Sequence, residues 1–271
     1  MLYVPDPNYN SHLNQAPSRN GCVNFNYVWD SDNQYWSPMG MSQTSAILGQ
    51  AKSSIHKFGS VSPVSNSVST ASPVTIWDGG TEYSFPPDTG EDLSIKSSDT
   101  SDSQEIKIVG LDANFEEKSY TATLNGTSTV SIGNWSRVFR AYNDGSTDLV
   151  GNVTIDNGVT DYLKILPDNN QTLMSIYTIP ANYTGYLVKF HCSAQNPASS
   201  SDINYTIHMK TREYGKVFRT RKIISISTGN SDEEELNFPT KLPPKTDIIF
   251  NVVSADGNNG SVNADFDIAL L

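Results

Sequence analysis

"INYTIHMKT" (residues 203–211) shows the pattern that decides the fold. Ile203, Tyr205, Ile207 and Met209 alternate with polar residues along this stretch. Successive side chains of a β-strand point to opposite faces of the sheet, so the alternation predicts a strand with one buried face and one solvated face.

Stretches of β-type sequence recur from Ile76 to the end of the chain. They are residues 105–111, 118–124, 135–142, 151–155, 161–166, 172–179, 186–194, 216–227, 233–238, 247–255 and 262–271. Turn signals such as Asn125-Gly126 and Asn157-Gly158 lie between or beside them. A strand every 8–12 residues or so without an intervening helix predicts an all-β antiparallel sandwich of the jelly-roll kind.

A break at Pro167-Asp168-Asn169 divides these strands roughly evenly. We therefore predict two small β-domains, residues 76–167 and 168–271, with a single larger sandwich as the alternative. Residues 1–75 form a separate N-terminal assembly segment in this prediction.

The first 41 residues contain Tyr27, Trp29, Tyr35 and Trp36 without a helix or strand period. Disordered segments are usually poor in aromatic residues, so we expect an irregular segment that packs on another surface.

Residues 42–58 are predicted to form one short helix. Ile47, Ala51, Ile55 and Phe58 fall on one apolar stripe, and Gly59 follows as a stop signal. Such a helix of about four turns is marginal alone and must dock on a partner.

Residues 59–75, "GSVSPVSNSVSTASPVT", are predicted to be extended. Pro63 and Pro73 exclude a central strand. A flexible linker and an arm that orders along a sheet edge or a neighbouring subunit fit this composition equally well. We expect Trp77 to anchor the arm to the body, unless it is an ordinary core residue, and Gly79-Gly80 to turn the chain.

The charge and composition disfavour several classes of protein. Asp and Glu outnumber Lys and Arg by 29 to 18, which gives a formal net charge of −11. This charge disfavours nonspecific nucleic-acid binding. Two cysteines are not a disulfide framework. We also expect no signal peptide at the N-terminus and no membrane helix.

The sequence carries no local motif for catalysis, a cofactor or a metal, so we expect a protein that is not an enzyme. The four histidines show no HxH or HExxH spacing, the cysteines no CxxC spacing, and no G-x-S-x-G or Walker motif occurs. A structural calcium ion is the alternative for the acidic stretches 97–105 and 254–261 and for Asp265 and Asp267. Ordinary turn chemistry explains these residues more simply.

A third of the basic residues lie close together in the second predicted domain. They are Lys210, Arg212, Lys216, Arg219, Arg221 and Lys222. Like charges on paired strands repel each other, so an anionic partner is expected opposite them. The run Asp232–Glu235 supplies such a partner, within the subunit or between subunits.

Several stretches resemble a family of virion structural proteins from tailed bacteriophages, especially marine and cyanobacterial ones. The stretches are "IWDGGTEYSFP" (76–86), "IKIVGLDANFEE" (106–117), "TLNGTSTV" (123–130), "SRVFRAY" (136–142), "NNQTLMSIYTIPANYTGYL" (169–187), "GKVFRTR" (215–221) and "LPPKTDI" (242–248). They are strand and turn sequences and contain no catalytic motif.

The resemblance implies a non-enzymatic component of a virion, such as a capsid decoration or cement protein. A head-fibre, collar or tail component and a carbohydrate- or receptor-binding module are the alternatives, and a glycosidase ranks third. We expect a homo-oligomer, with a trimer as working stoichiometry, that contacts the major capsid protein and needs no cofactor. The residues expected at assembly interfaces are Ile47, Ile55, Phe58, Trp77, Arg212, Arg219 and Arg221.

Overall fold

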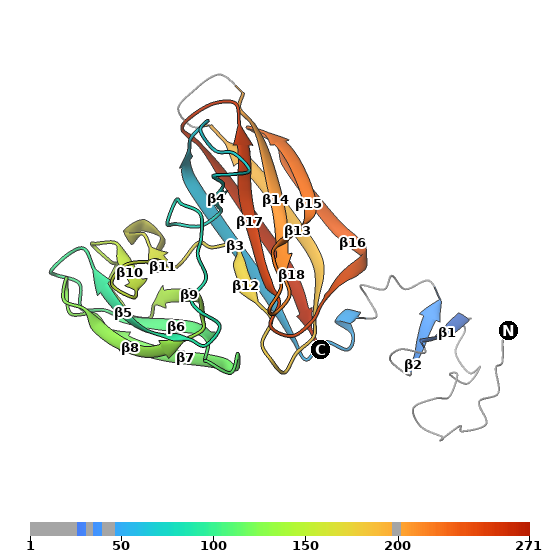
Figure 1. Ribbon diagram of the computed structural model, residues 1–271, viewed down its shortest axis with the longest axis horizontal. Helices are drawn as coiled ribbons and strands as arrows, with labels where there is room; N and C mark the ends of the chain where they lie inside the picture. Colours follow the sequence, from blue (N-terminus) through green and yellow to red (C-terminus); the bar gives the residue numbers. More distant parts are fainter. Residues whose placement is uncertain (1–25, 31–34, 40–46, 197–201) are drawn as a thin grey trace.

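The structure is a computed structural model that describes residues 26–30, 35–39, 47–196 and 202–271. Most of its regular structure is antiparallel β-sheet, so the predicted all-β sandwich fold is confirmed. Figure 1 shows a tall sandwich built mainly from the C-terminal strands, with a smaller sandwich from the middle of the chain beside it. A hairpin of β1 (Asn26–Asp30) and β2 (Tyr35–Met39) lies apart from both sandwiches.

The larger sandwich has two sheets. Its strands are β3 (Ser53–Val64), β4 (Val74–Thr75), β12 (Ile176–Thr178), β13 (Gly185–Gln195), β14 (Asn204–Arg212), β15 (Arg219–Ser227), β16 (Ser231–Leu242), β17 (Asp247–Ala255) and β18 (Gly260–Leu270). One sheet has the order β16-β13-β18-β3, and in the other β15-β14-β17 is followed by both β4 and β12. With β4 and β12 taken as one strand, the eight strands follow the orders 1-8-3-6 and 2-7-4-5, which define a jelly roll.

The strands β4 and β12 are two halves of one edge strand. The first half pairs with Asn251 and Val252, and the second half continues along β17 from Ile249 to Asp247. The chain leaves the jelly roll after Ile76 and returns at Ser175, whose N–H donates to the Ile76 carbonyl at 3.0 Å. Residues 77–174 are therefore an insertion within the second strand of the jelly roll.

The inserted segment forms the smaller sandwich. Its strands are β5 (Glu91–Ser97), β6 (Glu105–Leu111), β7 (Glu117–Thr123), β8 (Val130–Trp135), β9 (Arg137–Asn143), β10 (Val153–Asp156) and β11 (Asp161–Ile165). They form a four-stranded sheet, β11-β10-β5-β8, and a three-stranded sheet, β7-β6-β9. The sequence break at 167–170 coincides with a short 3-10 helix, Pro167–Asn169, shortly before the chain returns to the jelly roll.

Each sandwich has its own hydrophobic core. Phe190, Phe250 and Phe266 are fully buried in the jelly-roll core, and Trp135 is the largest fully buried side chain of the insert. The alternation that predicted the strand at 203–211 is confirmed, because Tyr205, Ile207 and Met209 are buried while the residues between them are partly exposed.

The strand β3 shows that the helix predicted over residues 42–58 is wrong from Ser53 onward. Ile47 and Leu48 are helical, but Ser53–Val64 is a strand that pairs along its length with β18. Ile55 and Phe58 therefore lie on opposite faces of a strand rather than on one helical stripe. A short helix is marginal alone, whereas pairing with β18 gives this segment backbone hydrogen bonds and a core to pack on.

Residues 59–64 and 74–75 are extended and lie along sheet edges, as one of the two readings of this segment predicted, but they belong to the jelly roll, so the boundary placed at residue 75 is wrong. Gly59–Val64 belongs to β3, and Val61 and Val64 are buried in the jelly-roll core. Pro63 fits because β3 is at the edge of its sheet. The segment that precedes the sandwich therefore ends near residue 52 instead of residue 75. In the parts of the chain that the structure describes, no helix has the length and apolar character needed to cross a membrane.

Candidate functional site

The two sandwiches meet at a buried carboxylate, Asp247, at the start of β17. Arg137 of β9 donates from Nε to Oδ1 at 2.9 Å and from Nη2 to Oδ2 at 3.2 Å. Arg212 of β14 donates from Nε and Nη2 to Oδ2 at 2.8 and 2.6 Å. Thr178 of β12 donates its hydroxyl to Oδ1 at 2.6 Å. One carboxylate thus joins the insert to three strands of the jelly roll.

Aromatic rings cover the two guanidinium groups at this junction. The Arg137 guanidinium lies 4.9 Å from the centre of the Phe115 ring, and that of Arg212 lies 4.7 Å from the Phe218 ring. Burial by itself lowers the pKa of Arg137, but the Asp247 carboxylate overcomes this effect and raises it. Arg137 also donates to Asp88 at 2.7 Å. The junction therefore holds the insert in one orientation on the jelly roll.

The basic residues predicted to form one cluster have different partners. Arg212 lies at the junction, Arg221 pairs with Glu213 at 3.6 Å, and Arg219 is exposed at the start of β15. Lys222 forms an ion pair with Glu234, which belongs to the expected acidic run. Asp247 was missed because it lies 35 residues after Arg212 and 110 after Arg137, with no local motif to connect them.

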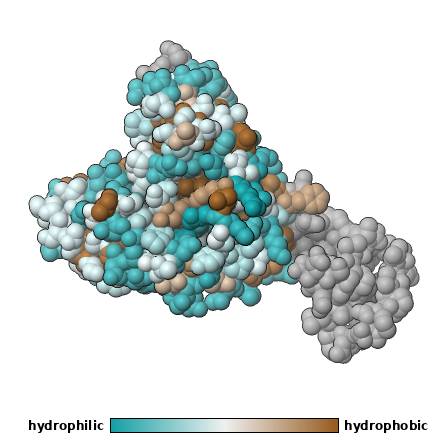
Figure 2. All heavy atoms as spheres, viewed as in Figure 1, coloured by the Kyte–Doolittle hydropathy of each residue, from teal (hydrophilic) through white to brown (hydrophobic). Residues whose placement is uncertain are grey.

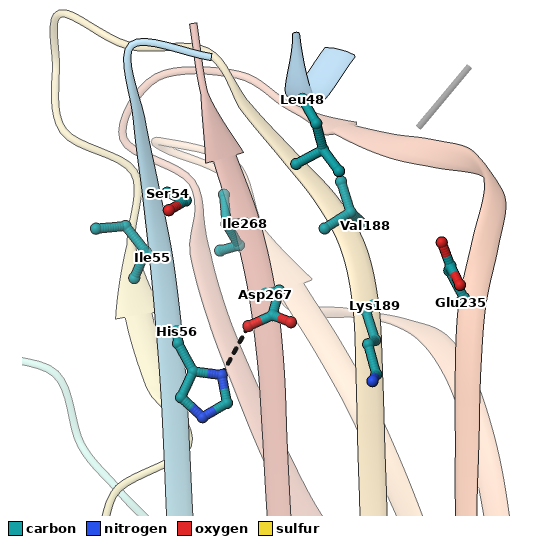
Figure 3. Close-up of a pocket in the computed structure, with 9 residues that line it drawn as sticks. All are labelled: Leu48, Ser54, Ile55, His56, Val188, Lys189, Glu235, Asp267 and Ile268. Carbon is teal, nitrogen blue, oxygen red and sulfur yellow. Dashed lines mark hydrogen bonds and ion pairs between the residues drawn. The ribbon is translucent and has the colours of Figure 1, made fainter. Parts of the chain in front are cut away.

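A groove of about 320 Å³ opens on the sheet β16-β13-β18-β3, where the N-terminal segment joins β3. Its apolar lining residues are Leu48, Ile55, Val188 and Ile268, and its polar ones are Ser54, His56, Lys189, Glu235 and Asp267. Figure 3 shows Leu48 next to Val188 towards one end and the His56–Asp267 pair towards the other. The groove therefore combines an aliphatic part with a charged rim.

The rim is held by ion pairs across neighbouring strands. His56 Nδ1 lies 2.7 Å from Asp267 Oδ1, and Lys189 Nζ lies 2.5 Å from Glu233. Glu235 lies opposite Lys189 in the strand register and forms no ion pair with the residues that the structure describes.

The acidic residues considered for calcium make contacts within the chain. Asp267 pairs with His56, and Asp265 pairs with His191 at 2.9 Å. In the loop 97–105, Asp102 accepts the Ser97 hydroxyl at 2.5 Å, and in the loop 254–261 Asp256 accepts the Asn204 amide at 2.7 Å. Within residues 26–30, 35–39, 47–196 and 202–271, no group of three or more His, Cys, Asp or Glu residues is placed to hold a metal ion.

The predicted docking residues lie in two places. Ile55 lines the groove, and the exposed Phe58 stacks on His56 with ring centres 5.8 Å apart. Ile47 is half-buried and directly precedes Leu48. Trp77 is buried at the crossing into the insert, where its indole N–H donates to the Thr81 carbonyl at 2.9 Å.

Figure 2 shows one face of the molecule that is largely hydrophilic, with hydrophobic residues singly or in small groups.

Comparisons with known proteins give little similarity. No family model and no curated protein matches the chain. Among solved structures, a chain from the structure of infectious bursal disease virus, Gx strain, is 10% identical with a TM-score of 0.21, over 80% of this chain and 75% of that chain. A chain from the Gt strain is 8% identical with a TM-score of 0.17, over 81% and 79%. Superpositions with TM-scores this low do not establish a common fold.

Proposed function

We propose that this protein is a non-enzymatic structural component of a virion, specifically a capsid decoration protein of a tailed bacteriophage. The observation that carries the proposal is an open groove beside the junction of the N-terminal segment with β3, on a jelly roll with a closed core. Jelly rolls occur in viral capsid proteins and also in lectins and cupins. Because a fold alone does not assign a function, the proposal depends on the groove and the segment.

The junction between the sandwiches supports a structural role. The side chains of Arg137 and Asp247 are 3% and 2% exposed, so the ion pair that joins the two sandwiches is protected from solvent. Breaking a buried pair of this kind costs several kcal/mol, about 3–5 in typical proteins. A body that keeps its two parts in fixed orientation suits a repeated component of a particle. Its partners in this proposal are neighbouring copies and the major capsid protein.

The groove favours a protein ligand over a sugar. Sugar-binding sites commonly use exposed aromatic rings, but the apolar residues that line the groove are aliphatic, and the exposed Phe58 ring beside it is stacked on His56. Carbohydrate or receptor binding is therefore the alternative, and it predicts binding of the full chain to a glycan array.

Purified particles provide the test. We expect the full chain to sediment with intact particles through a density gradient in a fixed ratio to the major capsid protein. Cryo-electron microscopy of the same particles should then show the two joined sandwiches on the outer surface of the capsid. Density on the tail or collar would instead identify the protein as a tail or collar component, which is the alternative, and would contradict a role in capsid decoration. A chain found only in the soluble fraction would contradict a virion role altogether.

A further inference from the structure

We propose that the groove on the sheet β16-β13-β18-β3 of one copy receives the turn between β14 and β15, residues 213–218, of a second copy of this chain. This inference rests on the assembly role proposed above, because it names the surface of the neighbouring copy that occupies the groove. Both surfaces lie in the part of the chain that the structure describes, and they match in charge and in apolar character.

The sheet that carries the groove has an excess of carboxylates on its outer face. Directly opposite residues share a face, and residues two apart on a strand return to it. The register therefore places four carboxylates together in two neighbouring rows: Glu233, Glu235, Asp265 and Asp267. The same rows contain one lysine, Lys189, and two histidines, His56 and His191. Figure 3 shows one of these rows, from His56 on β3 to Glu235 on β16. The face around the groove therefore attracts cations.

The β14–β15 turn has the opposite charge. Lys216, Arg219 and Arg221 line one small depression at this turn, together with Glu213. Lys216 and Arg219 are exposed, and neither forms an ion pair within the described part of the chain. Val217 lies between them in the chain and is 73% exposed. An aliphatic side chain flanked by two cations is the complement of an aliphatic groove with an acidic rim.

The turn is held in place before any partner binds. The Tyr214 ring lies edge-on to Phe115 with ring centres 5.6 Å apart, and the Phe218 ring lies 5.8 Å from Phe85. Both partners belong to the insert. Residues 216–217, between the two anchored rings, remain exposed. A surface that is fixed in advance loses little conformational entropy when it binds.

The turn and the groove of one copy do not meet. They have no lining residue in common, and the anchored rings hold the turn on the insert. We therefore place the turn of another copy in the groove. Val217 then packs on Leu48 and Val188, and Lys216 approaches the Glu235 carboxylate. Because the two surfaces differ, each copy uses its turn on one neighbour and its groove on another, and a ring forms if the rotation closes.

Sedimentation velocity of the full chain over a range of concentrations measures this contact. We expect reversible oligomers that Lys216→Glu weakens by about tenfold or more in Kd, because the substitution brings like charges together. Glu235→Lys in the groove should weaken association to a similar degree. Lys107→Glu is the matched control, since it makes the same change of charge at a partly exposed position of β6 in the insert. It should change the Kd by no more than about twofold.

Mixing the two charge-reversed variants tests whether the turn of one copy meets the groove of another. Each variant alone has a turn and a groove of like charge. In the mixture, the Lys216→Glu turn meets the Glu235→Lys groove, and the unchanged turn meets the unchanged groove. We expect the mixture to associate about tenfold more tightly than either variant alone. Both variants remain acidic, as the wild-type net charge of −11 ensures, so general attraction between oppositely charged chains does not produce this result.

The aliphatic part of the contact is tested with Val217→Ser. It should weaken association by about tenfold and leave the thermal unfolding temperature unchanged. Val159→Ser is the control, because Val159 is a 93% exposed valine in the insert and lines neither surface.

Three results would overturn the proposal. They are a chain that is monomeric throughout the concentration range, oligomers that neither charge reversal weakens, and a mixture that associates no better than its components. All of these readouts use purified protein, so their outcome is independent of whether the chain is found in particles.

Discussion

Arg137 and Asp247 are 110 residues apart in sequence and form a buried ion pair with Nε–Oδ1 and Nη2–Oδ2 distances of 2.9 and 3.2 Å. The first residue belongs to the inserted sandwich and the second to the jelly roll. Asp247 also accepts Arg212, so a single carboxylate balances two cations at the junction.

Replacing Asp247 with Asn should therefore be strongly destabilising. The amide removes the buried carboxylate that Arg137 and Arg212 share and leaves Arg137 with only the more exposed Asp88, so we expect the free energy of unfolding to fall by about 3–5 kcal/mol. Urea denaturation measures the change. Asp232→Asn, which removes a carboxylate from an exposed position, should stay within about 0.5 kcal/mol of wild type. Equal stability of the two variants would mean that the junction does not hold the sandwiches together.

Lys57 should make stability depend on pH in the alkaline range. Its ammonium group is buried against the Phe139 carbonyl, and burial lowers its pKa to about 7, with a further contribution from Arg140. The folded-state pKa is below the unfolded value of 10.5. The buried charge therefore destabilises the folded protein most below pH 7, and this destabilisation declines as the pH rises to 10.5.

The variant Lys57→Met removes this titration. The stability of wild type relative to Lys57→Met should increase by about 1.4 kcal/mol per pH unit between pH 7 and 10.5. Thermal or urea unfolding at several pH values gives the slope. A difference that does not change over this range would show that Lys57 does not titrate as the burial implies.

Asp78 should make the protein less stable as the pH rises in the acidic range, which is the opposite of the effect of Lys57. It lies at the crossing into the insert, where its carboxylate accepts the Leu173 N–H at 2.8 Å, and burial raises its pKa to about 7. The folded-state pKa is above the unfolded value of 3.8, so stability is greatest below pH 3.8 and is lost as the pH rises to 7.

Asp78→Asn keeps an acceptor for Leu173 but carries no charge. It should be more stable than wild type at pH 7 and above, and the advantage should disappear as the pH falls towards 4. Unfolding curves for both proteins at pH 4 and pH 8 provide the comparison. An advantage of the same size at both pH values would exclude Asp78 as the cause.

Gly59→Ala tests the assignment of β3. A Cβ at this position would lie 2.3 Å from the Ser175 amide nitrogen and 2.7 Å from the Ile76 carbonyl oxygen. The neighbouring backbone has to shift, and we expect a loss of about 1–3 kcal/mol in the free energy of unfolding. Ser60→Ala on the same strand is the control and should have little effect. A stable Gly59→Ala protein would favour the extended arm that the sequence predicted.

The sequence could predict the class of fold because strand periodicity is local. Tyr205, Ile207 and Met209 alternate with polar residues, and this pattern gives the strand and its buried face without knowledge of any neighbour. Turn residues likewise predict where strands are connected, as at Gly158, where φ is 89°. The sequence predicted Ile55 and Phe58 as docking residues on a helix, whereas the structure places both on the strand β3 beside the groove.

Residues 53–58 were misassigned to a helix because their apolar residues fit a helical period, while residues 42–46 of the same prediction lie outside the described part of the chain. Ile55 and Phe58 are three apart, and the partner that makes this segment a strand, β18, begins about 200 residues later. Pairing of this kind depends on contacts that no local window contains. The same reason explains why Asp247 was missed as the partner of Arg137.

The sequence by itself thus determined an acidic all-β chain with strands, turns and buried faces at defined positions, because these follow from side-chain chemistry over a few neighbouring residues. Only the tertiary structure decided that residues 53–76 belong to the C-terminal jelly roll, that residues 77–174 interrupt its second strand, and that Asp247 joins the two sandwiches. These features depend on which distant segments meet, and the free energy that selects them comes from burial and pairing across the whole chain.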